Sequence, residues 1–161
     1  NTENECSAKV KKFTDFGKGI LIIYGPNGTG KTRTACCAIN HRIAQHVQPG
    51  DFISCGNEVC PMIRSSRSFK AERSEYDTLK YYYTTPFLVI DEVGKGDDSV
   101  IAKMFVPNVL AARYNNQLPT LMTTNLTKDE LMEFLGKDIE DRLAEVGSEA
   151  VLMGKNYRRG N

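Results

Sequence analysis

One short motif constrains the fold of this chain more than any other feature of its sequence. Residues 25–32 read GPNGTGKT and match the pattern G-x-x-x-x-G-K-[ST]. They directly follow an apolar run, GILIIY at 19–24, and directly precede a helical pattern at 32–47. In this position the glycines let the backbone wrap around a polyphosphate, so that main-chain N–H groups and the positive end of the helix meet the negative charge. The motif therefore predicts a phosphate-binding loop between a buried strand and a helix.

The loop also assigns roles to individual side chains. We expect Lys31 to reach the β and γ phosphates of ATP or ADP, and Thr32 to place its hydroxyl on Mg²⁺. The residues expected to contact the nucleotide are Gly25, Pro26, Asn27, Gly28, Thr29, Gly30, Lys31 and Thr32. The alternative is a glycine-rich turn with a solvated lysine, but the strand before the motif and the helix after it favour the nucleotide site.

A second motif, FLVIDE at 87–92, ends an apolar run with two adjacent carboxylates. We expect Asp91 to hold the magnesium shell and Glu92 to polarise the attacking water. This pair favours an ATPase over a kinase for small molecules, because such a kinase needs no base for water. The alternative is a cap for the turn after the strand, which is common for a lone Asp but not for Asp-Glu.

Strand and helix patterns alternate along the chain. The expected strands are 19–24, 52–55, 87–90, 120–124 and 151–153, and the expected helices are 32–47, 101–114, 127–136 and 138–147. We expect Pro107 to bend or restart the second helix, and the box Thr127-x-x-Glu130 to cap the third. Unbroken apolar runs suit strands that are covered on both faces. The pattern therefore predicts an α/β fold with a central parallel sheet between layers of helices.

Composition excludes several classes of protein. The 161 residues carry 21 Lys and Arg against 20 Asp and Glu, so the net charge of +1 gives no global attraction to nucleic acid or an anionic membrane. Apolar runs fall well short of the roughly 20 residues of a membrane span, so we expect a cytoplasmic protein with no membrane partner. The five cysteines form no paired CxxC units, which argues against a disulfide framework or a zinc site. The first residue is Asn rather than Met, so we expect a fragment.

Several segments, in their order, resemble the AAA+ ATPase domain of bacterial replicative helicase loaders of the DnaC and DnaI type, and nearly as closely the IstB-type transposition ATPases. The matching segments are GPNGTGKT, FLVIDEVG, VLAARYNNQLPTLMTTNLT, ELMEFLGKDIEDRLAE and NYRR. The resemblance implies a P-loop NTPase of AAA+ type with a reduced or absent lid. It makes 19–161 the ATPase domain, and 1–18 a leader or the remnant of a linker to a missing N-terminal domain. The short, neutral form is similar to phage or mobile-element relatives.

The same resemblance adds three polar residues to the site. It implies that Asn125 senses the γ phosphate or the attacking water, and that Arg142 is an arginine finger for the ATP of a neighbouring subunit. It also implies that Arg158, with Arg159 as the fallback, contacts the phosphates of its own subunit's nucleotide. Without the family, Asn125 would turn the chain before the next helix, and Arg142 would form a surface ion pair with Asp138.

A local basic segment is a candidate nucleic-acid surface within this neutral chain. Its candidate contacts, with one more from the loop at 94–99, are Arg64, Arg67, Phe69, Lys70, Arg73 and Ser99. On a helix over 62–73, basic side chains at every third residue would form a drifting stripe that can follow phosphates, with an aromatic ring for base stacking. The family binds single strands in this region. The alternative is a solvated helix face, and Asp97 and Asp98 would repel phosphate at the second loop.

Together these features predict an ATP-dependent helicase loader that binds single-stranded DNA and helps to place a hexameric helicase on it. The expected partners are the ring helicase, contacted through the missing N-terminal segment, single-stranded DNA, and further copies of the chain assembled through the ATP site. A phage-encoded form would work in the cytoplasm of its bacterial host. The alternative is a transposition helper that acts on duplex DNA and a transposase.

Overall fold

Five parallel strands form a single sheet in the computed structural model, which describes residues 2–46, 48–55, 57–68, 72, 74–94 and 100–154. The strands are β1 (Ile20–Tyr24), β2 (Gly50–Ser54), β3 (Phe87–Val93), β4 (Thr120–Thr124) and β5 (Gly147–Val151). Their order across the sheet is β2-β3-β4-β1-β5, and every neighbouring pair is parallel. The structure thus confirms the α/β fold with a central parallel sheet.

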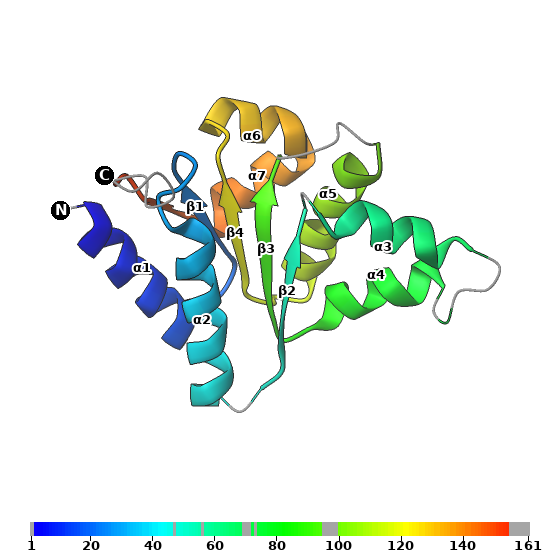
Figure 1. Ribbon diagram of the computed structural model, residues 1–161, viewed down its shortest axis with the longest axis horizontal. Coiled ribbons are helices and arrows are strands. Elements are labelled where there is room, and N and C mark those ends of the chain that lie inside the picture. The colour runs from blue at the N-terminus through cyan, green and yellow to red at the C-terminus, as the bar shows by residue number, and fades with distance from the viewer. Residues whose placement is uncertain are drawn as a thin grey trace.

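Helices cover both faces of this sheet (Figure 1). They are α1 (Thr2–Phe16), α2 (Lys31–His46), α3 (Val59–Ser66), α4 (Glu75–Thr84), α5 (Val100–Asn115), α6 (Lys128–Leu135) and α7 (Lys137–Val146). Helices α1 and α2 lie on one face, α5, α6 and α7 lie on the other, and α3 and α4 lie beside the edge strand β2 (Figure 1).

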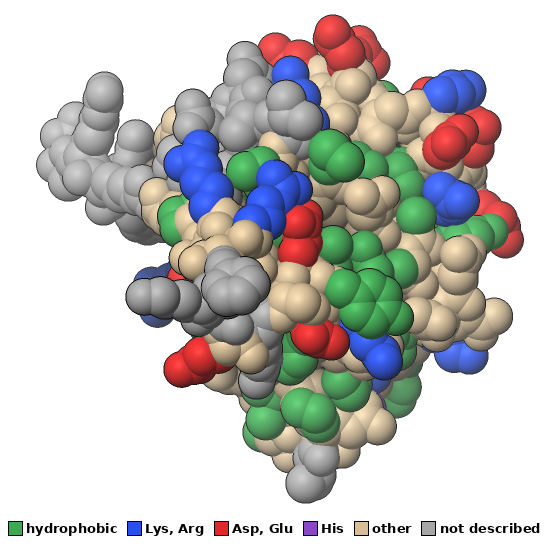
Figure 2. All heavy atoms as spheres, turned by 90° about the vertical axis from the view of Figure 1, so that its right-hand side faces the viewer, with side chains coloured by type: hydrophobic (Ala, Val, Ile, Leu, Met, Phe, Trp, Pro, Cys, Tyr) green, Lys and Arg blue, Asp and Glu red, His purple; other side chains and the backbone are tan. Residues whose placement is uncertain are grey.

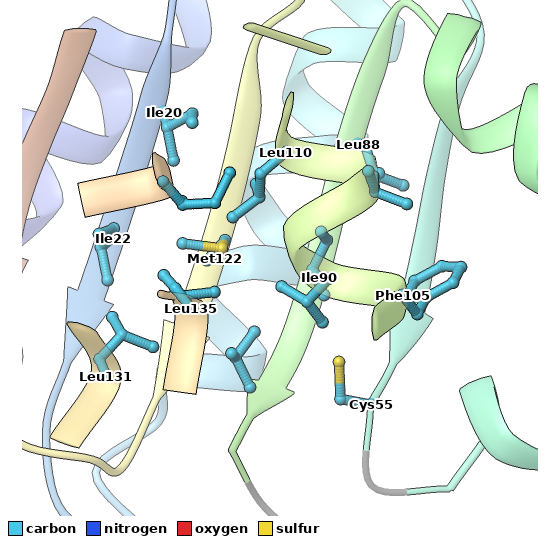
Figure 3. Packing of buried hydrophobic residues seen from close by; sticks show 14 of the residues in the cluster. Ile20, Ile22, Cys55, Leu88, Ile90, Phe105, Leu110, Met122, Leu131 and Leu135 are labelled. Atoms are coloured by element: carbon cyan, nitrogen blue, oxygen red, sulfur yellow. The ribbon is translucent and has the colours of Figure 1, made fainter. Parts of the chain in front are cut away.

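The apolar side chains of β1 point alternately to the two faces of the sheet. Ile20 and Ile22 belong to the core under α5, α6 and α7, where they pack with side chains such as Met122 and Leu110 (Figure 3). Leu21 and Ile23 belong to the core under α1 and α2. Because successive strand residues point to opposite faces, a strand covered on both sides is apolar throughout, which explains the unbroken run at 19–24.

Some expected boundaries were wrong. The last strand runs over Gly147–Val151 rather than 151–153, because Gly147, the residue that ends α7, already has an extended backbone. Helix α7 begins at Lys137 after Gly136, so Asp138 lies in its first turn rather than at the cap. Helix α5 continues through Pro107 without restarting.

Other local predictions are confirmed. The capping box of α6 is present, with the Thr127 hydroxyl accepting from the Glu130 N–H and the Glu130 carboxylate accepting from the Thr127 N–H. None of the helices in the described part of the chain is both long and apolar enough to cross a bilayer.

The amino-terminal residues form part of the folded core. Cys6, Val10 and Phe13 of α1 are buried against α2 and the sheet. At the end of α1, Asp15 accepts from Lys11 and is 2.6 Å from His41 Nε2 of α2. The interpretation of residues 1–18 as a leader or linker remnant stays a prediction, as does the boundary at residue 19.

Arg113 is a fully buried cation near the carboxyl end of α5. Its Nε donates to Thr120 Oγ1 at 2.7 Å, its Nη1 to the carbonyl oxygens of Tyr82 and Thr85 at 2.7 Å each, and its Nη2 to that of Pro119 at 2.8 Å. Burial lowers the pKa of Arg113 to about 10, so the guanidinium stays charged at pH 7 with these donors engaged. One side chain therefore joins the end of α4, the end of α5 and the start of β4.

Candidate nucleotide site

Three loops that carry the predicted site residues meet at one edge of the sheet. All strands are parallel, so their carboxyl ends lie together. Strand β1 leads into the phosphate loop, β3 ends with Asp91 and Glu92, and β4 leads into Asn125. Because β4 lies between β1 and β3, Asn125 falls between the loop and the carboxylates.

Two glycines give the phosphate loop its shape. Gly30 has a left-handed φ of 94° directly before α2, a backbone that side chains other than glycine adopt with strain. Gly25 lies against the residues after β5, where an added Cβ would be 2.3 Å from the Leu152 carbonyl oxygen. These positions let main-chain N–H groups line the cradle before the first turn of α2, as phosphate binding requires.

Lys31 ties the loop to the neighbouring strand end. Only 7% of the residue is exposed, and its Nζ donates to the carbonyl oxygens of Gly25 and Pro26 at 2.7 and 2.8 Å. The same Nζ donates to Asn125 Oδ1 at 2.5 Å. The structure thus brings the predicted phosphate lysine and the predicted sensor into direct contact, although the sensing role of Asn125 stays a prediction.

Asp91 and Thr32 form the predicted metal-binding pair. Asp91 is buried, and its Oδ2 accepts from Thr32 Oγ1 at 2.9 Å. Its Oδ1 accepts from Thr123 Oγ1, one strand away, at 2.5 Å. Sequence reasoning missed Thr123, and only its place near the end of a buried strand could have indicated it.

The residues fit Mg²⁺ that arrives with a nucleotide. Within the described ranges, no group of three or more His, Cys, Asp or Glu side chains could hold a metal ion unaided. Mg²⁺ is usually bound by one or two protein oxygens together with substrate phosphates and waters. One carboxylate and one hydroxyl beside a phosphate loop match that pattern.

Glu92 occupies a local distortion of β3. Its φ is 57°, which is unusual for a residue other than glycine, and the pairing of β3 with β4 shifts register between Ile90 and Val93. The backbone N–H of Glu92 donates to Thr123 Oγ1 at 3.0 Å. Such bulges and strained conformations occur often at active sites, where they turn a side chain away from the regular strand direction.

These groups surround an open cavity of about 610 Å³. Its wall includes Asn27, Gly28, Thr29, Gly30, Lys31, Thr32, Glu92 and Asn125 from the predicted set. Sequence reasoning missed other wall residues: Glu3 and Ser7 of α1, Cys36 of α2, and Leu152. Burial, with smaller contributions from Asp91 and Cys37, raises the pKa of the Cys36 thiol, which keeps this wall residue neutral at pH 7.

Sequence comparison points to one group of proteins. No family model matches the chain. The replicative helicase loader DnaI of Bacillus subtilis is 28% identical over 124 residues, which cover 76% of this chain and 38% of DnaI. The replicative helicase loader DnaC of Escherichia coli is 27% identical over 148 residues, which cover 89% of this chain and 57% of DnaC. The chain thus spans only part of the length of either relative.

Solved structures give the same result for the fold. A crystal structure of the DnaC helicase loader matches with a TM-score of 0.76 and 22% identity over 94% of this chain and 90% of that chain. The chain is therefore similar to the DnaC and DnaI helicase loaders in both sequence and fold. The replication initiator DnaA, bound to AMPPCP and single-stranded DNA, matches with a TM-score of 0.73 and 15% identity over 93% of this chain and 46% of that chain.

Arg142 lies on α7, away from the cavity of its own chain. Its Cζ lies 5.6 Å from the centre of the Tyr114 ring, and its Nη1 makes a long contact of 3.4 Å to the Asp138 carbonyl oxygen. The expected ion pair with the Asp138 carboxylate is not formed, since the contact goes to the backbone. Arg158 and its fallback Arg159 lie outside the described residues.

The predicted basic stripe over 62–73 is not one helix. Helix α3 ends at Ser66, whose hydroxyl donates to the Ile63 carbonyl oxygen and so competes with the next helical turn. Arg67 caps the helix end, and its Nε and Nη2 donate to the carboxylate of Glu75 on α4 at 2.6 and 2.8 Å. Within this stripe, Arg64 is exposed on α3, while Phe69, Lys70 and Arg73 lie outside the described residues, as does Ser99.

Figure 2 looks onto the side of the molecule that carries α3 and α4. Basic and acidic side chains lie next to each other there, with exposed hydrophobic side chains beside them (Figure 2). The bond to Glu75 raises the pKa of Arg67, and the bond to Arg67 lowers the pKa of Glu75. Both groups stay charged and Glu75 compensates the charge of Arg67, so Arg64 is the stronger candidate for a phosphate contact.

Proposed function

We propose that this AAA+ domain binds and hydrolyses Mg-ATP as the ATPase part of a replicative helicase loader. The observation that carries the proposal is the convergence of Lys31, Asp91 and Asn125 at one edge of the sheet. Two relatives named as replicative helicase loaders align over 76% and 89% of this chain, which supports the loader role.

Each residue of the site has a task in this proposal. Lys31 and the loop N–H groups bind the phosphates, which requires Lys31 Nζ to exchange its present oxygen partners for phosphate oxygens. Thr32 and Asp91 hold Mg²⁺, which neutralises charge on the phosphates when bound. Glu92 accepts a proton from the attacking water, and Asn125 orients that water or the γ phosphate.

The remaining partners follow from the loader role. Copies of the chain would assemble through the ATP site, with Arg142 of one copy completing the site of its neighbour. A segment ahead of α1 would contact the ring helicase, and single-stranded DNA would lie along α3. The place of action would be the bacterial cytoplasm, where the host's helicase is found.

Nucleotide binding can be tested by replacing Lys31. Lys31→Ala should weaken ATP binding about 10- to 100-fold, because hydrogen bonds to charged groups contribute about 1.5–3 kcal/mol. A fluorescent ATP analogue titrated in the presence of Mg²⁺ measures this change. The exposed Lys128 lies outside the cavity, so Lys128→Ala serves as the control. Equal affinities for Lys31→Ala and the wild-type chain would rule out the phosphate role.

The nucleic-acid partner can be tested by competition between single-stranded and duplex DNA. We expect preference for the single strand, and we expect Arg64→Ala to weaken binding while reducing the slope of log affinity against log salt by about 0.7, the value for one phosphate contact. Lys12→Ala, on the exposed side of α1, should leave the slope unchanged. Preference for duplex DNA would overturn the loader role in favour of the transposition helper.

A further inference from the structure

Tyr114 connects two oppositely charged side chains of α7. It lies in the last turn of α5, where its ring faces the Arg142 guanidinium at 5.6 Å. Its hydroxyl donates to Glu145 Oε2 at 2.5 Å. The tyrosine thus contacts the cation with its ring and the anion with its hydroxyl.

The spacing of Arg142 and Glu145 makes this arrangement informative. Side chains three residues apart on a helix are neighbours, and opposite charges at that spacing can pair. Arg142 nevertheless forms no ion pair with a carboxylate of the described residues. Glu145 instead accepts from the Tyr114 hydroxyl, and this bond raises the pKa of Tyr114. This competing anion is therefore held by a neutral group.

We propose that Tyr114 is a positioning residue for Arg142. The ring supports one side of the guanidinium, and the hydroxyl keeps Glu145 from pairing with it. Most N–H donors of Arg142 are then available for a phosphate that develops charge in a neighbouring subunit. This inference rests on the role of Arg142 given under the proposed function, and it assigns the contact that keeps the arginine ready for that role.

Tyr114→Phe separates the contribution of the ring from the contribution of the hydroxyl. Phenylalanine keeps the ring under the guanidinium but frees Glu145, which can then pair with Arg142. ATP turnover per subunit should fall about 2- to 5-fold at unchanged KM, because one surface ion pair must then break before Arg142 can act. Turnover is measured with single-stranded DNA at protein concentrations that allow assembly. Glu145→Gln alone should leave turnover near the wild-type level, since the amide oxygen still accepts from the hydroxyl.

The double variant Tyr114→Phe/Glu145→Gln provides the decisive comparison. Removing the competing charge should restore turnover to within 2-fold of the wild type, a rescue that a merely structural role of the hydroxyl would not produce. Normal turnover in Tyr114→Phe, or no rescue in the double variant, overturns the inference.

Arg142→Ala distinguishes failure of this inference from failure of the proposed function. Wild-type turnover in Arg142→Ala would remove the arginine finger itself. A loss in Arg142→Ala with normal turnover in Tyr114→Phe would instead keep the finger and overturn only the positioning role. Thermal unfolding of every variant checks that the α5–α7 packing persists.

Discussion

Replacement of Glu92 by glutamine should lower ATP turnover about 10²- to 10⁴-fold, the usual contribution of a positioned general base. The amide has nearly the shape of the carboxylate but cannot accept the proton of the attacking water. Nucleotide binding should persist, because Lys31, Thr32 and Asp91 remain in place. We thus expect Glu92→Gln to bind ATP but to hydrolyse it very slowly.

Steady-state turnover and equilibrium binding of an ATP analogue must be measured on the same preparations. The matched control is Glu133→Gln, an equivalent change at an exposed position on α6. Turnover of Glu92→Gln within a few-fold of the control would show that Glu92 is not the base. Loss of binding instead would mean that the strained backbone at this position, with φ of 57°, shapes the cavity itself.

Replacement of Arg113 by methionine should lower the free energy of unfolding by about 3–5 kcal/mol. Methionine fills similar space, but it leaves the carbonyl oxygens of Tyr82, Thr85 and Pro119 without the donors that Arg113 supplies. A buried acceptor that loses its partner costs about 1–3 kcal/mol. Since single domains are typically stable by only about 5–15 kcal/mol, the loss is a large fraction of the total.

Urea unfolding at pH 7 measures this loss, and thermal unfolding should show a midpoint lower by about 10 °C for a chain of this size. Arg113→Lys should fall between wild type and Arg113→Met, because one ammonium cannot reach all the acceptors that the guanidinium spans. Arg64→Met, on the exposed side of α3, should change stability by no more than about 0.5 kcal/mol. A similarly small change in Arg113→Met would show that the acceptors find other partners.

The sequence predicted best where chemistry fixes both residue type and spacing. The phosphate loop and Asp91 were assigned from short motifs next to apolar runs, and Asn125 was implied by the family resemblance. The parallel sheet then required all three to meet at one edge. The predicted ends of helices and strands depended on weaker sequence signals. Helix α3 ends early because a serine bonds back to its own turn, and β5 begins at Gly147 because α7 ends there.

Contacts between residues far apart in the sequence could not be predicted from local patterns. Nothing in the helical pattern of 101–114 singles out Arg113, and only the folded chain brings the carbonyl oxygens of Tyr82 and Pro119 around it. Glu3 and Ser7 lie far from any motif, yet the packing of α1 on α2 places them at the cavity. Such roles depend on which elements become neighbours, which no local pattern specifies.

Helix α1 and the phosphate loop both contribute residues to the cavity. Helix α1 begins beside the cavity and runs away from it, and β1 leads back to the phosphate loop (Figure 1). In the proposed site the loop at 25–32 therefore contacts the phosphates, whereas Glu3 and Ser7 of α1 form another part of the cavity wall. A fluorescent label attached at Glu3 or Ser7 would therefore stand in the cavity wall, whereas a label at the exposed Tyr76 of α4 would stand clear of it.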